Sequence, residues 1–145
     1  MEKLLISACL LGGNCRYDGG NNALSEEVLA ALRARWELLP VCPERDGGMS
    51  TPRIPSERRG ESVVNRAGED VTAFFVRGAE IALRTARDAG CRYALLKERS
   101  PSCGSGLIYD GSFTGTLVPG DGLAAEALRA AGIAVYGENG LKMLL

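Results

Sequence analysis

The sequence predicts an α/β protein, a small Rossmann-like three-layer fold with a mostly parallel sheet of about four strands plus a β-hairpin. Two observations predict this fold. Short apolar runs alternate with helical patterns, which is the order expected of a parallel sheet covered by helices on both faces. Asp110-Gly111, between two strand-like runs, is a strong hairpin signal. The chain has 145 residues, enough for one domain with a substantial core, so we expect a single domain over residues 1–145.

The first third of the chain is expected to form a strand, a helix and a second strand. Residues 3–9 are almost continuously apolar, which is typical of a central parallel strand. Residues 12–20 form a glycine-rich loop without the spacing of a Walker or dinucleotide motif, so this loop is either a flexible connection or the wall of a pocket. Ser25 suits the N-cap of a helix that runs to about residue 35. Residues 38–42 are the second strand.

The middle of the chain is expected to hold a loop and the longest helix. Residues 49–68 contain few apolar residues, so a long ordered loop is expected there. Asp70 is expected to cap a helix over about residues 70–88, where apolar residues recur at helical spacing, and Gly90 ends it. Cys91 then opens the third strand and is expected to pack in the core, because a buried free cysteine behaves as a small apolar residue.

The last third is expected to add the hairpin, a helix and the final strand. Residues 107–109 and 112–117 are the strand-like runs on either side of the hairpin signal. Asp121 is expected to cap the last helix, which Gly132 closes. Residues 133–136 form the last strand.

Composition excludes several classes of function. The net charge of −1 gives no electrostatic basis for binding a nucleic acid polymer or an anionic membrane, although a small anionic substrate held by one or two arginines remains possible. The longest apolar runs are far shorter than a membrane span and the first residues resemble no signal peptide, so we expect a cytoplasmic protein. Histidine is absent, so any acid–base chemistry must use Asp, Glu, Lys, Tyr or a hydroxyl group.

Three of the five cysteines are expected to meet in space. Cys9 and Cys42 end the first two predicted strands, and Cys103 lies just past the third. Parallel strands about 5 Å apart end at one edge of the sheet, so these thiols converge there. Three thiolates suit zinc or an iron–sulfur cluster and leave one coordination position open for a substrate. The alternative is three packing cysteines, and Cys15 is either a fourth ligand or clear of the site.

The loop after the third strand places polar side chains at the same edge. Residues 97–106 hold Cys103 and two hydroxyls, and Pro101 stops the strand. Ligands bind at the carboxyl edge of open α/β sheets. Ser100 and Ser102 can donate to a substrate or activate it; the alternative is that they cap a surface turn.

Two charged residues are further candidates. Glu44, two residues after Cys42, can act as a general acid or base beside a metal centre, or it is an exposed salt-bridge partner. Arg53, flanked by Pro52 and Pro55, is a candidate contact for an anion or a carbonyl group.

Three separated blocks of the chain resemble, in order, those of the thiouracil desulfidase (TudS) family. The blocks are Ser7-Ala8-Cys9-Leu10-Leu11-Gly12 with Cys15-Arg16-Tyr17-Asp18-Gly19, Val41-Cys42-Pro43-Glu44 with Gly47-Gly48 and Pro52-Arg53, and Ser100-Pro101-Ser102-Cys103-Gly104. The similarity covers nearly the whole chain.

The resemblance implies an enzyme with an oxygen-sensitive 4Fe-4S cluster that is held by three cysteines and has one iron open. The implied reaction converts 2- or 4-thiouracil to uracil and hydrogen sulfide without net redox change. The implied ligands are Cys9, Cys42 and Cys103, and the implied catalytic residues are Glu44 and Ser100. Because Cys15 also matches the family pattern, the choice of three ligands among four cysteines stays open. Cluster-assembly machinery is the implied protein partner.

Two alternatives remain. The same reaction can act on a thionucleotide such as 4-thiouridine monophosphate, whose phosphate would be held by backbone N–H groups from Ser102 to Gly106, including Gly104, with Arg53 or Arg16. The other alternative is a non-catalytic iron–sulfur or zinc module for sulfur transfer or sensing. Modification of tRNA is disfavoured by the charge balance.

Overall fold

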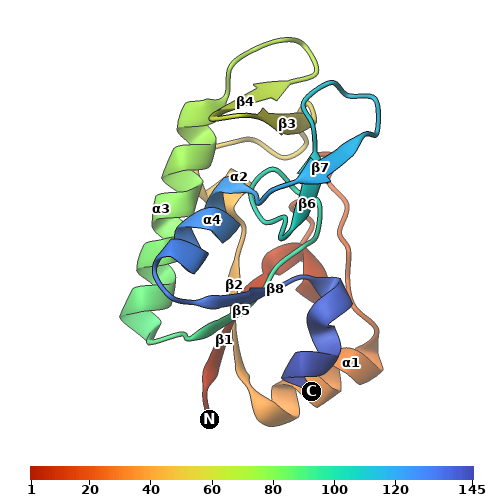
Figure 1. Ribbon diagram of the computed structural model, residues 1–145. Coiled ribbons are helices and arrows are strands. Elements are labelled where there is room, and N and C mark those ends of the chain that lie inside the picture. The colour runs from red at the N-terminus through yellow and green to blue at the C-terminus, as the bar shows by residue number, and fades with distance from the viewer.

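A computed structural model describes residues 1–145 and confirms the predicted α/β class (Figure 1). The main sheet has four parallel strands in the order β2 (Glu37–Val41), β1 (Lys3–Ser7), β5 (Tyr93–Leu95) and β8 (Ala134–Tyr136). The predicted number of strands and their parallel direction are therefore correct. None of the helices combines the length and the apolar character that crossing a bilayer requires.

Helices cover both faces of this sheet. The helices α3 (Thr72–Ala89) and α4 (Leu123–Ala130) pack on one face, and α1 (Glu26–Arg35) and the 3₁₀ helix η2 (Glu138–Leu144) pack on the other (Figure 1). Neighbouring residues of β1 serve the two faces in turn, because successive side chains of a strand point in opposite directions. Leu5 joins the α3 and α4 side, whereas its neighbours join the α1 side.

The central strand is buried throughout, as its apolar sequence predicts. Leu4, Leu5 and Ile6 have no exposed surface, and burying each such side chain contributes about 1.5–3 kcal/mol. Strand β2 lies at an edge of the sheet, where Pro40 can occupy a strand position without removing a needed ladder hydrogen bond.

Helix ends agree with two of the predicted caps. Ser25 accepts a hydrogen bond from the Val28 N–H, and Gly90 ends α3 in the left-handed conformation with φ of 73°. Two other predictions need correction. The N-cap of α3 is Val71, although the Asp70 carboxylate still accepts the Thr72 N–H at 2.9 Å. Asp121 does not cap α4, because its carboxylate instead accepts the Gly106 N–H at 2.8 Å and pairs with Arg129.

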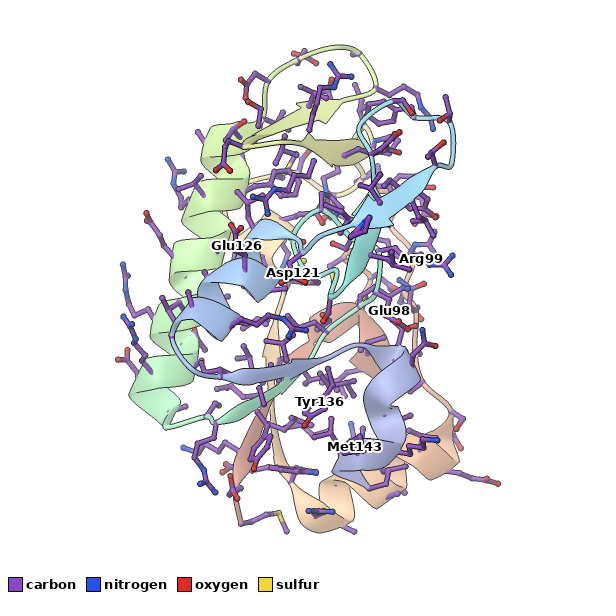
Figure 2. The ribbon with its side chains drawn as sticks, in the orientation of Figure 1. Glu98, Arg99, Asp121, Glu126, Tyr136 and Met143 are labelled. Atoms are coloured by element: carbon purple, nitrogen blue, oxygen red, sulfur yellow. The ribbon has the colours of Figure 1, made fainter.

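The predicted loop at residues 49–68 is wrong over part of its length. Strands β3 (Ser56–Arg59) and β4 (Ser62–Asn65) form an antiparallel hairpin there. Arg58 ties this hairpin to α4 by donating to the Asp121 carbonyl oxygen at 2.8 Å and pairing with Glu126 at 3.2 Å. Figure 2 shows Asp121 and Glu126 below the hairpins.

The second hairpin is confirmed, but its turn is longer than predicted. Strands β6 (Leu107–Tyr109) and β7 (Leu117–Pro119) pair antiparallel, so residues 110–116 are the connection and Asp110-Gly111 is not a two-residue turn. The Asp110 carboxylate accepts the Ser112 N–H at 2.9 Å and so shapes the longer loop.

The carboxyl edge of the main sheet faces both hairpins (Figure 1). Strand β1 stops at Ser7, and the 3₁₀ helix η1 (Ala8–Leu11) follows, so Cys9 lies just past the strand rather than within it. Strand β2 leads into the short helix α2 (Pro43–Asp46). The turns that follow β1, β2 and β5 therefore lie at one edge of the sheet, which the two hairpins face.

Candidate functional site

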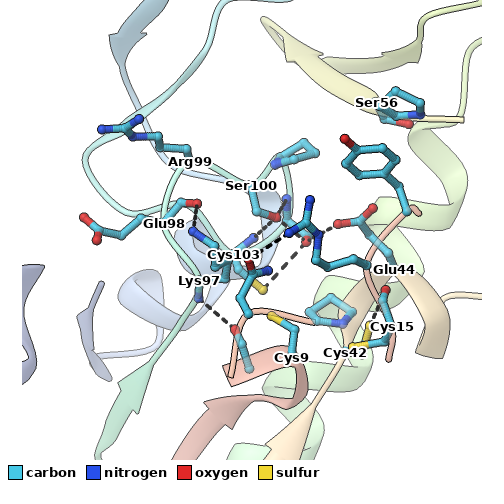
Figure 3. Close-up of a pocket in the computed structure, with 18 of the residues that line it drawn as sticks. Cys9, Cys15, Cys42, Glu44, Ser56, Lys97, Glu98, Arg99, Ser100 and Cys103 are labelled. Atoms are coloured by element: carbon cyan, nitrogen blue, oxygen red, sulfur yellow. Dashed lines mark hydrogen bonds between the residues drawn. The ribbon is translucent and has the colours of Figure 1, made fainter. Parts of the chain in front are cut away.

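Four thiols line one cavity at this edge. The cavity has a volume of about 680 Å³, and Cys9, Cys15, Cys42 and Cys103 all contribute to its wall. Each of the four is buried, and their sulfur atoms point toward the same space (Figure 3). The structure thus brings together the three cysteines predicted from strand ends and adds Cys15 from the glycine-rich loop. Cys91 packs in the core under α3 and α4, as predicted.

The thiols influence one another. A hydrogen bond with the Cys15 side chain lowers the pKa of Cys9. The pKa of Cys42 is raised by its hydrogen bond with Cys15 and by burial. Burial raises the pKa of Cys103 to about 12. The bond with Cys42 alone would lower the pKa of Cys15, but bonding to Cys9 and burial outweigh it and raise that pKa.

The donor set suits an iron–sulfur cluster. Because the chain has no histidine, the buried ligands available at the cavity are soft thiols. No three Cys, Asp or Glu side chains are gathered closely enough to hold a single ion. Cysteine thiolates are the residues that hold iron–sulfur clusters, so the chemistry of the donor set fits such a group.

Close packing of α2 on α3 positions Cys42 and Glu44. A Cβ atom at Gly78 of α3 would lie 2.0 Å from the Pro43 carbonyl oxygen, so only glycine permits this approach. The Asp46 carboxylate accepts the Cys42 N–H at 3.1 Å and closes the turn. Helix α2 therefore holds a thiol and a carboxylate in fixed positions at the cavity.

Glu44 is held by an arginine. The Arg53 Nε donates to Glu44 Oε1 at 3.2 Å, and the two side chains are 6% and 17% exposed. The other Arg53 donors bind protein oxygens of Cys15, Ser50 and Thr51. Arg53 lines the cavity as predicted, but its guanidinium is directed to protein groups.

The Ser100 to Cys103 loop contacts the other carboxylate oxygen of Glu44. Ser102 Oγ donates to Glu44 Oε2 at 3.0 Å, and Ser100 Oγ lies 2.9 Å from Ser102 Oγ. Both serines line the cavity, whereas Gly104 does not; its N–H donates to the Ser100 carbonyl oxygen.

The rest of the wall includes Tyr17, in the glycine-rich loop that the sequence offered as a possible pocket wall, and residues that no pattern indicated. Tyr17, Ser56, Arg66 and Phe113 line the cavity, and three of them come from the two hairpins or the residues beside them. The hydroxyl of Ser56 is buried without a hydrogen-bond partner, which suggests a polar contact for a bound molecule. Because β3 was not predicted, no sequence signal pointed to this side of the cavity.

Comparison with known proteins agrees with this geometry. The family model for 2-thiouracil desulfurase matches residues 4–140. The chain belongs to the 2-thiouracil desulfurase family. This family assignment confirms the resemblance found in the three sequence blocks.

Two relatives match this chain over nearly its whole length. A solved structure of the [4Fe-4S]-dependent thiouracil desulfidase TudS has 51% sequence identity and a TM-score of 0.94, covering 99% of this chain and 95% of that chain. The uncharacterized protein YbbK of Bacillus subtilis (strain 168) is 41% identical over 152 residues, covering 98% of this chain and 99% of YbbK. The shared fold extends over both hairpins and the main sheet.

Proposed function

We propose that this protein is an iron–sulfur-dependent desulfidase that removes sulfur from a thiolated pyrimidine, 2- or 4-thiouracil, and gives uracil and hydrogen sulfide. The observation that carries the proposal is the meeting of Cys9, Cys42 and Cys103 at a cavity that also holds the Glu44 carboxylate. The family match and the likeness to TudS support the same reaction.

A 4Fe-4S cluster would be held by Cys9, Cys42 and Cys103, with one iron left without a protein ligand. Bound there, the cluster supplies a soft Lewis acid beside the substrate sulfur. The proposal leaves Cys15 as a neighbour of the ligands, since its side chain interacts with Cys9 and Cys42. A cytoplasmic location and delivery of the cluster by assembly machinery stay predictions.

Glu44 and Ser100 are the proposed catalytic residues. A carboxylate held beside the cavity can take up the proton that is released when water attacks the carbon bearing sulfur. The pairing with Arg53 fixes the orientation of that carboxylate. The aromatic rings of Tyr17 and Phe113 in the cavity wall suit a flat pyrimidine.

A thionucleotide such as 4-thiouridine monophosphate is a second candidate substrate. Arg66 and Arg99 line the cavity and form no ion pair, and the Arg99 side chain extends outward from its loop (Figure 2). The N–H groups of residues 102–104 already donate to Ser100, so they are not free for a phosphate. If the nucleotide is preferred, Arg66→Ala should lower kcat/KM for the nucleotide and leave kcat/KM for free thiouracil unchanged.

Anaerobic reconstitution with iron and sulfide, followed by addition of 2- or 4-thiouracil, tests the main proposal. A brown protein with about four irons per chain should release one sulfide for each uracil formed. Cys91→Ala is the matched control and should keep this activity, because Cys91 packs in the core under α3 and α4. A fully loaded protein that releases no sulfide from thiouracil or 4-thiouridine monophosphate contradicts the proposal.

A further inference from the structure

No hydrogen bond joins Glu44 directly to Ser100; a third side chain connects them. Ser102 Oγ lies 3.0 Å from Glu44 Oε2 and 2.9 Å from Ser100 Oγ. Ser102 is only 1% exposed, so it is better placed to connect these two groups than to contact a substrate. We propose that Ser102 is a positioning residue that carries a proton from Ser100 to Glu44. This inference rests on the proposed function.

The direction of the hydrogen-bond chain follows from its donors and acceptors. A carboxylate only accepts, so Ser102 gives its single hydroxyl proton to Glu44. Ser100 Oγ accepts the N–H groups of Ser102 and Cys103, both at 3.1 Å, and these occupy its two lone pairs. Ser100 must therefore donate to Ser102. The Cys103 sulfur, 3.7 Å from Ser102 Oγ, is the weaker competing acceptor.

This order of donors supports one balanced proton transfer. Ser100 passes its proton to Ser102, and the electron pair that this leaves on Ser100 Oγ then removes a proton from water, breaking one O–H bond of the water. Ser102 passes its proton to Glu44, which becomes a neutral acid. The hydroxide adds to the carbon bearing sulfur, and the electron pair of the carbon–sulfur π bond moves onto sulfur. The two N–H groups at Ser100 Oγ stabilise negative charge that develops there during the transfer.

Helix α4 fixes the loop that carries the Ser100 and Ser102 hydroxyls. The carbonyl oxygens of Pro101 and Ser102 each accept an N–H from the first turn of α4, from Leu123 and Ala124 respectively, at 2.9 Å. A Cβ atom at Gly122 would lie 2.4 Å from the Ser102 carbonyl carbon, so glycine is required for this contact. A rigid loop is what a proton chain of fixed direction needs.

The test replaces Ser102 in the cluster-loaded enzyme and measures the single-turnover rate. Ser102→Ala should lower this rate about 100-fold while changing thiouracil binding by less than about threefold. Ser102→Thr keeps a hydroxyl and should recover at least about tenfold of the loss. Ser105→Ala, on the same loop but outside the chain of hydroxyls, is the control and should match the wild type.

A solvent-deuterium series separates a relay from a merely structural role. A plot of the wild-type rate against the deuterium fraction of the solvent should be curved, because several protons move together. The same plot for Ser102→Ala should be linear. The relay is overturned if Ser102→Ala keeps the wild-type rate, if fully loaded Ser102→Thr is no faster than Ser102→Ala, or if the lost rate follows lost iron. A wild-type enzyme that releases no sulfide would instead overturn the proposed function.

Discussion

The four thiols at the cavity have different surroundings. Cys103 is buried among protein atoms, and burial raises its pKa to about 12. Cys15 interacts through its thiol with the thiols of both Cys9 and Cys42. Its backbone carbonyl oxygen also accepts from Arg53 at 2.8 Å. We predict that Cys15 supports the three proposed ligands and does not bind iron itself.

Anaerobic iron analysis of single alanine variants tests this division. Cys9→Ala, Cys42→Ala and Cys103→Ala should each lose nearly all bound iron, because each removes a ligand. Cys15→Ala should keep most of its iron, with affinity weakened about 10–100-fold. If Cys15→Ala is as iron-poor as the other three variants, Cys15 is a ligand and the choice of three is wrong.

Some residues of the site could be predicted from the sequence, whereas the contacts of others depend on tertiary packing. Cys9, Cys42 and Cys103 could be predicted because each follows an apolar strand, and strand ends meet at one edge. The pairing of Arg53 with Glu44 could not, since it depends on where a loop side chain turns. The position of Ser102 between two polar groups is equally a product of tertiary packing.

At the scale of elements, the contact between α2 and α3 decides where Glu44 lies. Gly78 of α3 and Gly47 after α2 face each other's backbones, and a Cβ atom on either would fall within 2.2 Å of a carbonyl oxygen. Backbone atoms cannot move aside as a flexible side chain can. The position of the Glu44 carboxylate therefore depends on close contact between the backbones of α2 and α3.

Replacing Gly78 with alanine should damage both stability and activity. Alanine favours a helix by about 1 kcal/mol over glycine, but overpacking costs about 1–3 kcal/mol or more. Because the clash is with backbone, we expect net loss in the free energy of unfolding, measured by urea denaturation, and slower sulfide release. Glu80→Ala, exposed on the same helix, should change stability by less than about 0.5 kcal/mol. Unchanged unfolding of Gly78→Ala would show that α2 and α3 can separate freely.

Elements differ in how far their sequence specifies them. The main strands are apolar and could be predicted directly, as could the longest helix. Strand β3 has no apolar residue, so no periodic pattern marks it. Contacts with a distant segment fix it instead: Glu57 accepts the N–H groups of Gly111 and Phe113, at 3.0 and 3.1 Å. One wall of the cavity is therefore specified only by the folded chain.

At the scale of the whole molecule, the thiol site shares a core with the chain's C-terminus. Leu144 is 1% exposed and belongs to the same apolar cluster as Cys9 and Cys42. The indole N–H of Trp36 donates to the Leu144 carbonyl oxygen at 2.7 Å, which fixes the last turn against α1. The C-terminal segment thus helps to close the face of the sheet beneath the cavity.

Shortening this side chain should lower global stability. Leu144→Ala removes a fully buried side chain, and such changes cost about 2–5 kcal/mol in free energy of unfolding. Urea denaturation measures the loss, and Met143→Ala is the matched control because Met143 is 64% exposed. Equal midpoints for the two variants would mean that the C-terminal turn contributes little to the core.

The spread of the cavity thiols along the chain has a consequence for biosynthesis. Cys9 and Cys103 lie 94 residues apart in the chain, so translation supplies the first of these thiols well before the last. An incomplete nascent chain therefore lacks a full set of sulfur donors, however well its early strands have formed. If Cys9, Cys42 and Cys103 hold the proposed cluster, its insertion has to follow translation of the third parallel strand and the loop beyond it.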